Sequence, residues 1–343
     1  MNRTVSQSEL KTWMQCQRRH WFTYEKGLRS KRTPTAFLVG TAFHDALSDY
    51  YSGVDESGVL AHANTIALEA DGMASIDGEW RDAEEWEGAE YQAARVRGML
   101  RAYAQRYPRG EFLDAFALEE RFFVPWSFGD EQWTLSGRFD GIAQDDNGEW
   151  WLLEHKTAAG NAVELITNLR LDLQVNFYLH MADLLHASGK APQVAGVLYN
   201  VIVKPQIRPV LVYEACWEDV VVIAETKAEA VNAVMQQCSE ADRRFIAVDK
   251  RRQTPEEYEE RIIVHMLADP AGCFVRRYVA RSERQRETFA GELASILNAF
   301  ARSPGYPNFQ SCDRCHFRVL CAASPADRPH LQEQFFEIES VQK

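Results

Sequence analysis

The chain has 343 residues, and its 38 Lys and Arg against 50 Asp and Glu give a formal charge of 38 − 50 = −12. Hydrophobic residues make up 46% and charged residues 26%, the usual balance of a globular protein with a sizeable core. The apolar runs fall far short of the ~20 residues of a membrane helix, and the N-terminus lacks the apolar segment of a secretory signal. Membrane and secreted classes are therefore excluded, and we expect a cytoplasmic protein.

Acidic residues concentrate in one segment of the chain. Residues 55–90 hold eleven acids and one base, which accounts for −10 of the total charge. Basic residues cluster elsewhere, over 18–32 and 276–286. Each cluster is compatible with an ordinary solvated surface, but the overall acidity does not exclude a polyanionic partner.

The predicted elements begin with helices and continue as a mixture of strands and helices. Ser6-x-x-Glu9 has the form of a capping box and predicts a helix through about Cys16. Further helices are predicted over 41–51, 89–107, 169–187, 217–238, 255–268 and 282–301, and strands over 115–125, 132–143, 149–157, 194–204, 208–215 and 273–280. This order predicts a single α/β domain over 1–343 with a mixed central sheet flanked by helices, and we interpret 53–110 as an acidic helical insertion within it.

The second and third strands form a hairpin that brings charged residues together. Asp146-Asn147-Gly148 is a turn signal, and Gly148 suits the left-handed position of a three-residue loop. In that register the residue numbers of two paired residues sum to 294, so Asp140 lies opposite Glu154. Because side chains alternate between faces, Asp140, Glu154 and Lys156 then share one face. A two-residue loop would put the two carboxylates on opposite faces.

Two carboxylates at cross-strand distance repel each other unless a cation lies between them, and their oxygens suit Mg²⁺ or Mn²⁺. Lys156 can orient or deprotonate an attacking water, or stabilise charge on a phosphate. The alternative is a surface salt bridge, although Glu154-His-Lys156 ends an apolar strand, where charges are usually paired or coordinating. His44 offers a further ligand, and Gln174 and Tyr178 share a helix face at i, i+4. Taken alone, a single histidine or such a Gln–Tyr pair more often has a structural role.

The chain carries four short motifs in a fixed order: Gly40-x3-His44, Gly137-Arg-Phe-Asp140-Gly, Glu154-His-Lys156-Thr157 and Gln174-x3-Tyr178. Together they resemble the motif series of the PD-(D/E)XK nuclease superfamily, most closely its RecB-like exonuclease branch, from about Ser6 to Cys321. The resemblance implies a restriction-endonuclease-like core and metal-dependent phosphodiester hydrolysis. Phe-Asp stands where the superfamily's name has Pro-Asp, a position that varies in this branch.

The resemblance also implies a role for each motif residue. The implied metal ligands are His44, Asp140, Glu154 and the backbone carbonyl of His155. Lys156 would be the catalytic lysine, and Gln174 and Tyr178 would support the site and contact DNA.

Seven cysteines without a secretory signal favour thiols or ligands over disulfides. Cys312-x2-Cys315-x5-Cys321 supplies three ligands of a thiolate site, and Cys16 is the natural fourth. RecB-like nucleases that contain an iron–sulfur cluster have one cysteine before the nuclease motifs and three after them, so the resemblance implies a [4Fe–4S] cluster joining Cys16 to 302–325. Zn²⁺ fits the same thiolates by spacing, and His20 or His316 could replace one cysteine.

These features predict an Mg²⁺- or Mn²⁺-dependent deoxyribonuclease, with an exonuclease on single-stranded ends favoured, in recombination, repair or phage or CRISPR DNA processing. The alternative is an inactive DNA-binding or scaffold protein that retains the fold and the cluster. No phosphate-binding loop motif occurs, so a helicase or recombination protein would be a separate partner. The predicted contacts to the DNA backbone are Arg18, Arg19, Arg29, Arg276 and Arg277.

Overall fold

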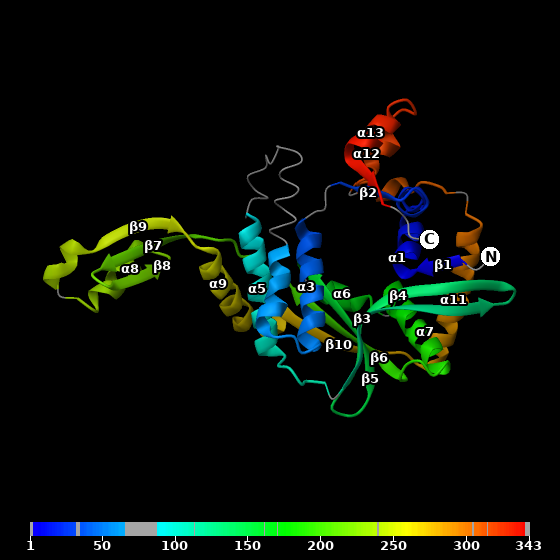
Figure 1. Cartoon of the computed structure of the whole chain (residues 1–343), viewed down its shortest axis with the longest axis horizontal. Coiled ribbons are helices and arrows are strands. Elements are labelled where there is room, and N and C mark those ends of the chain that lie inside the picture. Colours follow the sequence, from blue (N-terminus) through cyan, green and yellow to red (C-terminus); the bar gives the residue numbers. More distant parts are fainter. Residues whose placement is uncertain are drawn as a thin grey trace.

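A computed structural model describes residues 3–31, 35–65, 88–112, 114–160, 162–169, 171–238, 240–303, 305–313 and 315–339. Its centre is a mixed six-stranded sheet (Figure 1). The strands are β1 (Arg3–Ser6), β3 (Asp114–Phe128), β4 (Glu131–Gln144), β5 (Trp150–Ala158), β6 (Val194–Val203) and β10 (Phe274–Ala280). The order is β1-β4-β5-β6-β10, and β3 pairs with β4. The β1–β4 and β5–β6 pairs are parallel and the others antiparallel, so the predicted α/β fold with a mixed sheet is confirmed.

Helices cover both faces of this sheet, each over its own apolar cluster. One face packs against α1 (Gln7–Gln15), α7 (Leu173–Ala187) and α11 (Glu283–Ala301), and the other against α3 (Thr35–Tyr51), α5 (Ala89–Arg106) and α9 (Pro255–Ala268). The neighbours Val201 and Ile202 of β6 belong to different clusters, as the alternation of a strand requires. Shorter helices of the body include α6 (Ala162–Thr167) and α10 (Pro270–Cys273), and residues 56–65 are also helical. None of the described helices is both long and apolar enough to cross a membrane.

Part of the predicted acidic insertion is built into this body. Residues 66–87, which carry most of the acidic segment, lie outside the described residues. The segment that follows is α5, whose Tyr103 is fully buried. A Cβ at Gly98 would lie 2.8 Å from the Ile262 side chain, so glycine allows α5 and α9 to pack closely. This helix is therefore part of the second core.

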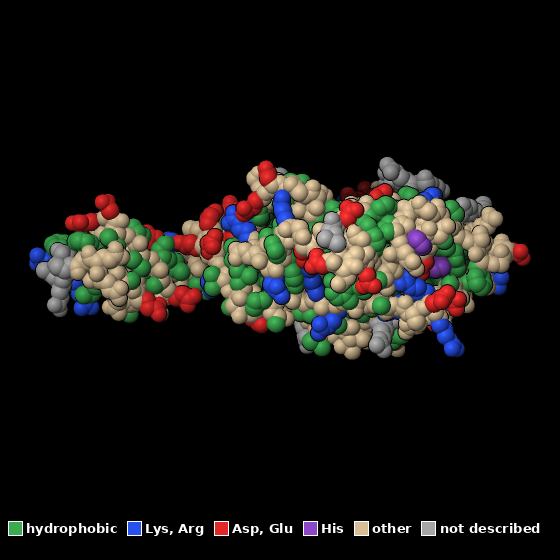
Figure 2. Space-filling view, turned by 90° about the horizontal axis from the view of Figure 1, so that it is seen from below, with side chains coloured by type: hydrophobic (Ala, Val, Ile, Leu, Met, Phe, Trp, Pro, Cys, Tyr) green, Lys and Arg blue, Asp and Glu red, His purple; other side chains and the backbone are tan. Residues whose placement is uncertain are grey.

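A separate small lobe projects from one end of the molecule (Figures 1 and 2). It consists of the sheet β8-β7-β9 with one helix, namely β7 (Leu211–Trp217), β8 (Val220–Ala224), α8 (Lys227–Met235), the 3-10 turn Glu240–Phe245 and β9 (Ala247–Arg252). The predicted helix over 217–238 is wrong in its first half. Glu218 adopts a positive φ of 52° and turns the chain, and the β-branched run that follows pairs with β7 instead. The capping box of Thr226 and Glu229 then starts α8.

The two ends of the chain lie together at the opposite end of the body (Figure 1). Strand β2 (Leu28–Ser30) pairs antiparallel with β11 (Phe336–Ile338). A small apolar cluster that includes Phe22, Phe317 and Leu320 lies beneath them. The short helical elements here are α2 (Gln17–His20), the π-helix Trp21–Glu25, the 3-10 turn Phe309–Ser311, α12 (Arg318–Ala322) and α13 (Arg328–Phe335).

Candidate active site

Two hairpins in succession, β3–β4 and β4–β5, set the register of the candidate site. Gly148 has the predicted left-handed φ of 81°, and Gly141 pairs with Leu153, so paired positions sum to 294 as predicted. The backbone N–H of His155 donates to Asp140 Oδ2 at 2.6 Å, which fixes the two strands beyond the last ladder pair. This contact holds Asp140 next to the Glu154–Lys156 segment, at the point where the β4–β5 ladder ends.

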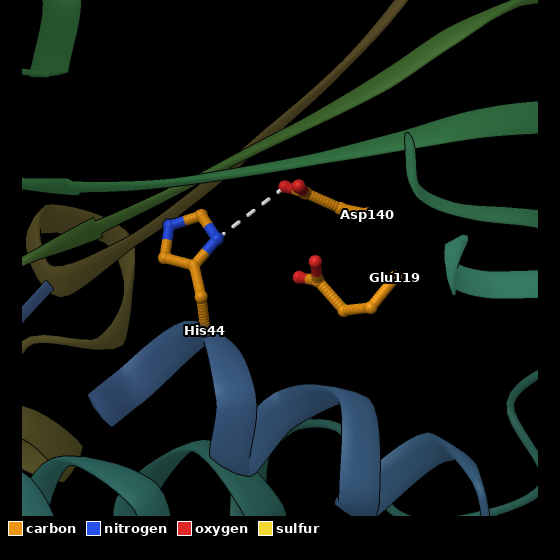
Figure 3. Close-up of side chains that lie close together, drawn as sticks. All are labelled: His44, Glu119 and Asp140. Atoms are coloured by element: carbon orange, nitrogen blue, oxygen red, sulfur yellow. Dashed lines mark ion pairs between the residues drawn. The ribbon is translucent and has the colours of Figure 1, made fainter. Parts of the chain in front are cut away.

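Three side chains from three elements form a cluster suited to a metal ion (Figure 3). His44 of α3, Glu119 of β3 and Asp140 of β4 each offer a ligand atom, and these atoms lie within 4.8 Å of one another. His44 Nδ1 is 3.6 Å from Asp140 Oδ2. Glu119 lies across from Asp140 because its neighbours Leu118 and Glu120 pair with the neighbours of Asp140. The structure thus joins two predicted ligands to a glutamate that the sequence motifs did not identify.

Glu154 lies beside this cluster in a buried ion pair. Its side chain is 3% exposed, and its Oε1 contacts the Lys156 ammonium and accepts a 2.8 Å hydrogen bond from Gln174 Nε2. Its Oε2 is buried and has no hydrogen-bond partner among the described residues. A buried carboxylate oxygen without a partner lowers the stability of the folded state. A cation bound to this oxygen would supply the missing partner.

The electrostatics of these groups favour cation binding. Burial, and then the charge of Asp140, raise the pKa of Glu119 to about 7, and burial followed by Asp140 also raises the pKa of Glu154. Burial raises the pKa of Asp140 too. Burial, and then Lys156, lower the pKa of His44 to about 4, so its imidazole is neutral at pH 7 and can act as a ligand. Crowded carboxylates beside a neutral imidazole are relieved by a bound cation.

The other motif residues support this arrangement. Burial tends to lower the pKa of Lys156, but Glu154 and Asp140 outweigh it and raise the pKa, so the ammonium form is held. Tyr178 packs edge-on against Phe139, and a Cβ at Gly137 would lie 2.8 Å from its ring, so glycine makes room for the tyrosine. The His155 ring stacks on Tyr51 of α3, and its Nδ1 lies 2.9 Å from Asn200 Nδ2.

The predicted DNA-contacting arginines differ in availability. The predicted DNA contact of Arg276 is corrected by the structure. Its guanidinium donates to Glu111, Tyr51 and Tyr103 inside the protein, so it is not available to bind a phosphate. Arg29 pairs with Glu339 at 2.6 Å. Arg277 is exposed, and Arg18 and Arg19 are half-buried.

The four predicted cluster cysteines gather where the chain ends meet. The backbone N–H of Asn308 donates to Cys16 Sγ at 3.3 Å, and Cys312 Sγ lies 3.8 Å from the Asn308 carbonyl. Burial raises the pKa of Cys321, and the thiols of Cys315, Cys16 and Cys312 add to that rise. No three of these four sulfurs, all in the described part of the chain, lie within 4.8 Å of one another. His20, the alternative ligand, contacts Glu9 at 2.9 Å.

A mixed sheet that presents a carboxylate–imidazole cluster beside a buried Glu-x-Lys pair defines the class of restriction-endonuclease-like, metal-dependent nucleases. The model of the PD-(D/E)XK nuclease superfamily matches residues 4–322, and the chain belongs to this superfamily. Membership implies metal-dependent nuclease activity and a DNA substrate. No curated protein matches the chain. Among solved structures it is similar to one titled "Crystal structure of SSO0001", with 15% identity over 95% of this chain and 87% of that chain and a TM-score of 0.30.

The raised pKa of Glu119 predicts that Glu119→Gln stabilises the metal-free protein. The pKa of Glu119 is about 7 in the folded protein and 4.5 for an ordinary glutamate. Between pH 4.5 and pH 7 the folded state therefore keeps a proton that the unfolded state has released. The wild type therefore loses stability relative to the variant as pH rises from about 4.5 to about 7, and the loss is complete above that range. We expect a gain of about 1–2 kcal/mol, or about 2–4 °C in Tm, at pH 8 and almost none near pH 4.5.

Thermal unfolding in EDTA across this pH range measures the effect. Glu120→Gln, at the exposed neighbouring position, is the matched control and should show no such trend. A Tm difference for Glu119→Gln that does not grow with pH would contradict the prediction.

Proposed function

We propose that this protein is an Mg²⁺- or Mn²⁺-dependent exonuclease that degrades DNA from free single-stranded ends. The observation that carries metal-dependent cleavage is the cluster of His44, Glu119 and Asp140 beside the buried pair of Glu154 and Lys156. Two carboxylates and one imidazole are donors that these cations accept. We include Glu154 and the His155 backbone carbonyl as further ligands, since Glu154 Oε2 is buried without a partner among the described residues.

A divalent cation held there would polarise the phosphodiester and lower the pKa of a water molecule at the site. The residues of the chain supply the remaining functions. The Lys156 ammonium orients the attacking water or stabilises the negative charge that develops on the phosphate. Gln174 holds Glu154 in position through its 2.8 Å hydrogen bond, and Tyr178 lines the site and contacts the DNA.

We propose that Cys16, Cys312, Cys315 and Cys321 hold a [4Fe–4S] cluster. The four thiols share one region, since Asn308 contacts both Cys16 and Cys312, and the other three thiols act on the pKa of Cys321. Zn²⁺ held by the same four thiolates is the alternative. His20 is a poor substitute ligand because Glu9 already contacts its ring.

The proposed substrate is DNA with free ends, processed during recombination, repair or phage or CRISPR DNA metabolism in the cytoplasm. Arg18, Arg19, Arg29 and Arg277 are the proposed contacts to the DNA backbone. A separate helicase or recombination protein would supply strand separation.

The test uses protein purified without oxygen and two substrates, end-labelled linear single-stranded DNA and closed circular single-stranded DNA. Each substrate is incubated with Mn²⁺, Mg²⁺ or EDTA. We expect linear DNA to be degraded only with metal and circles to survive. Cleavage of circles would make the protein an endonuclease. Binding without cleavage under every metal condition would support the inactive DNA-binding alternative and refute the proposed activity.

A further inference from the structure

The β3–β4 ribbon continues beyond the metal cluster as a row of side chains on the same face. From Ala117 to Phe128, residues of β3 pair with residues of β4 so that the two residue numbers sum to 259. Arg121 therefore lies opposite Arg138, and Phe123 opposite Ser136. Paired residues share a face, and the Arg138–Glu119 ion pair of 2.9 Å joins this row to the cluster. In Figure 1 the ribbon extends outward from the central sheet.

The opposite face of the ribbon is committed to the core. Trp126, Trp133, Leu135 and Phe139 are all less than 9% exposed and belong to the main apolar cluster. On the cluster face, by contrast, the Phe123 side chain is 58% exposed and Arg121 and Arg138 are exposed. The row is therefore open to a ligand from solvent.

Two arginines directly opposite each other on antiparallel strands destabilise the sheet. Arg138 is compensated by Glu119, but Arg121 has no ion pair or hydrogen bond to any residue that the structure describes. Glu119 also belongs to the metal cluster, so its charge is shared between Arg138 and a bound cation. An anionic ligand would neutralise the arginine pair, and a phosphate suits the guanidinium fork.

The exposed ring of Phe123 places a second, chemically different requirement on the ligand. An exposed ring on a rigid strand can stack on a base only if that base is unstacked from its neighbours, as in single-stranded nucleic acid. From Glu119 to Phe123 the strand advances about 13 Å, the length of a few nucleotides of an extended strand. A single strand that leaves the cleavage site presents phosphates and unstacked bases along its length. The arginines next to the metal cluster would contact its phosphates, and Phe123, farther along the strand, would stack on one of its bases.

We propose that Arg121, Arg138 and Phe123 form a single-strand subsite, in which the arginines hold the phosphates next to the scissile bond and Phe123 stacks on a base. The proposal rests on the proposed nuclease function and deepens it. It makes the single-strand preference a property of the β3–β4 ribbon.

Fluorescence anisotropy with a labelled oligothymidylate in EDTA tests the subsite without cleavage. Phe123→Ala is expected to weaken single-strand binding on the order of ten-fold and to leave blunt duplex binding unchanged. Arg121→Gln should weaken binding to both and reduce the slope of log affinity against log salt by about 0.7. Because Arg121 faces Arg138, Arg121→Gln should unfold at the same or a higher temperature than the wild type, which separates lost contact from misfolding.

The matched controls are Phe128→Ala, an exposed phenylalanine on the other face of β3, and Arg243→Gln, an exposed arginine of the distant lobe. Both should bind as the wild type does. If Phe123→Ala and Arg121→Gln also bind as the wild type does, the subsite is wrong although the nuclease proposal survives. If the wild type neither binds nor cuts DNA, the proposed function fails and the subsite with it. Equal losses on single-stranded and duplex DNA for Phe123→Ala would refute the stacking role.

Discussion

Replacing Lys156 with methionine is expected to lower the rate of DNA cleavage by about 10²–10⁴-fold while metal binding persists. Positioned charge and proton-transfer groups contribute effects of this size. The Lys156 ammonium contacts Glu154 and repels a divalent cation, so its removal should leave metal affinity unchanged or increase it. Glu154→Gln should instead weaken both cleavage and metal affinity, because it removes a negative charge next to the cluster.

Calorimetric titration with Mn²⁺, read beside single-turnover cleavage of linear single-stranded DNA, separates these outcomes. Lys190→Met, in the exposed turn after α7, is the control for loss of a lysine elsewhere. Without Lys156 the buried carboxylates of Glu154 and Asp140 are uncompensated in the metal-free state, so that variant should gain more thermal stability from Mn²⁺ than the wild type does. A Lys156→Met protein that cleaves at the wild-type rate would remove the lysine from the mechanism.

The proximity of Asp140 to Glu154 and Lys156 can be predicted from the sequence, because the length of the hairpin loop determines which residues of the two strands pair. The turn over 146–148 determines that the residue numbers of paired positions sum to 294. Counting outward from this turn predicts that Asp140 lies close to Glu154 and Lys156. No tertiary information is needed for that step. A helix covering the site is a different case: the sequence places His44 on a helix, but only the burial of Phe43 and Leu47 in the second core orients that helix over the sheet.

Glu119 could have been found by the same counting. Gly129 and Asp130 form a two-residue loop between Phe128 and Glu131, and Gly129 has a positive φ of 58°. The sum 128 + 131 = 259 places Glu119 opposite Asp140, because 259 − 140 = 119. The signal is therefore the Gly129-Asp130 turn, which the prediction of separate strands over 115–125 and 132–143 did not use.

The small lobe shows where local pattern fails. The segment 217–238 contains a β-branched run and a helix-forming run, and only the pairing of Val220–Ala224 with β7 divides them. β9 reads as a polar segment, since Asp249, Lys250, Arg251 and Arg252 fall within six residues. Its strand conformation comes from pairing with β7, a tertiary contact that overrides weak local preference.

Replacing Cys312 with serine is expected to abolish the proposed cluster and to destabilise the region where the chain ends meet. A centre that joins Cys16 to Cys312 closes a loop of 312 − 16 = 296 residues. For a loop of that length the entropic gain of a crosslink is on the order of 5 kcal/mol. A small apolar cluster around Phe22 and Phe317, the short β2–β11 pair and hydrogen bonds such as that from Asn308 Nδ2 to the Gln15 carbonyl also join these ends. Because these contacts are few and partly exposed, we expect loss of the centre to destabilise this region before the central sheet.

Iron and sulfide analysis, visible absorbance and thermal unfolding of protein purified without oxygen measure this effect. Cys238→Ser, in the distant lobe, is the control and should keep both the cluster and the Tm. In the Cys312→Ser protein, limited proteolysis should cut within 305–339 at rates well above the wild type, while the central sheet stays protected. Stoichiometric zinc without iron would retain the crosslink and refute the iron–sulfur assignment. A metal-free wild type with the same Tm as Cys312→Ser would refute both, because the thiols would then contribute nothing to holding the two ends of the chain together.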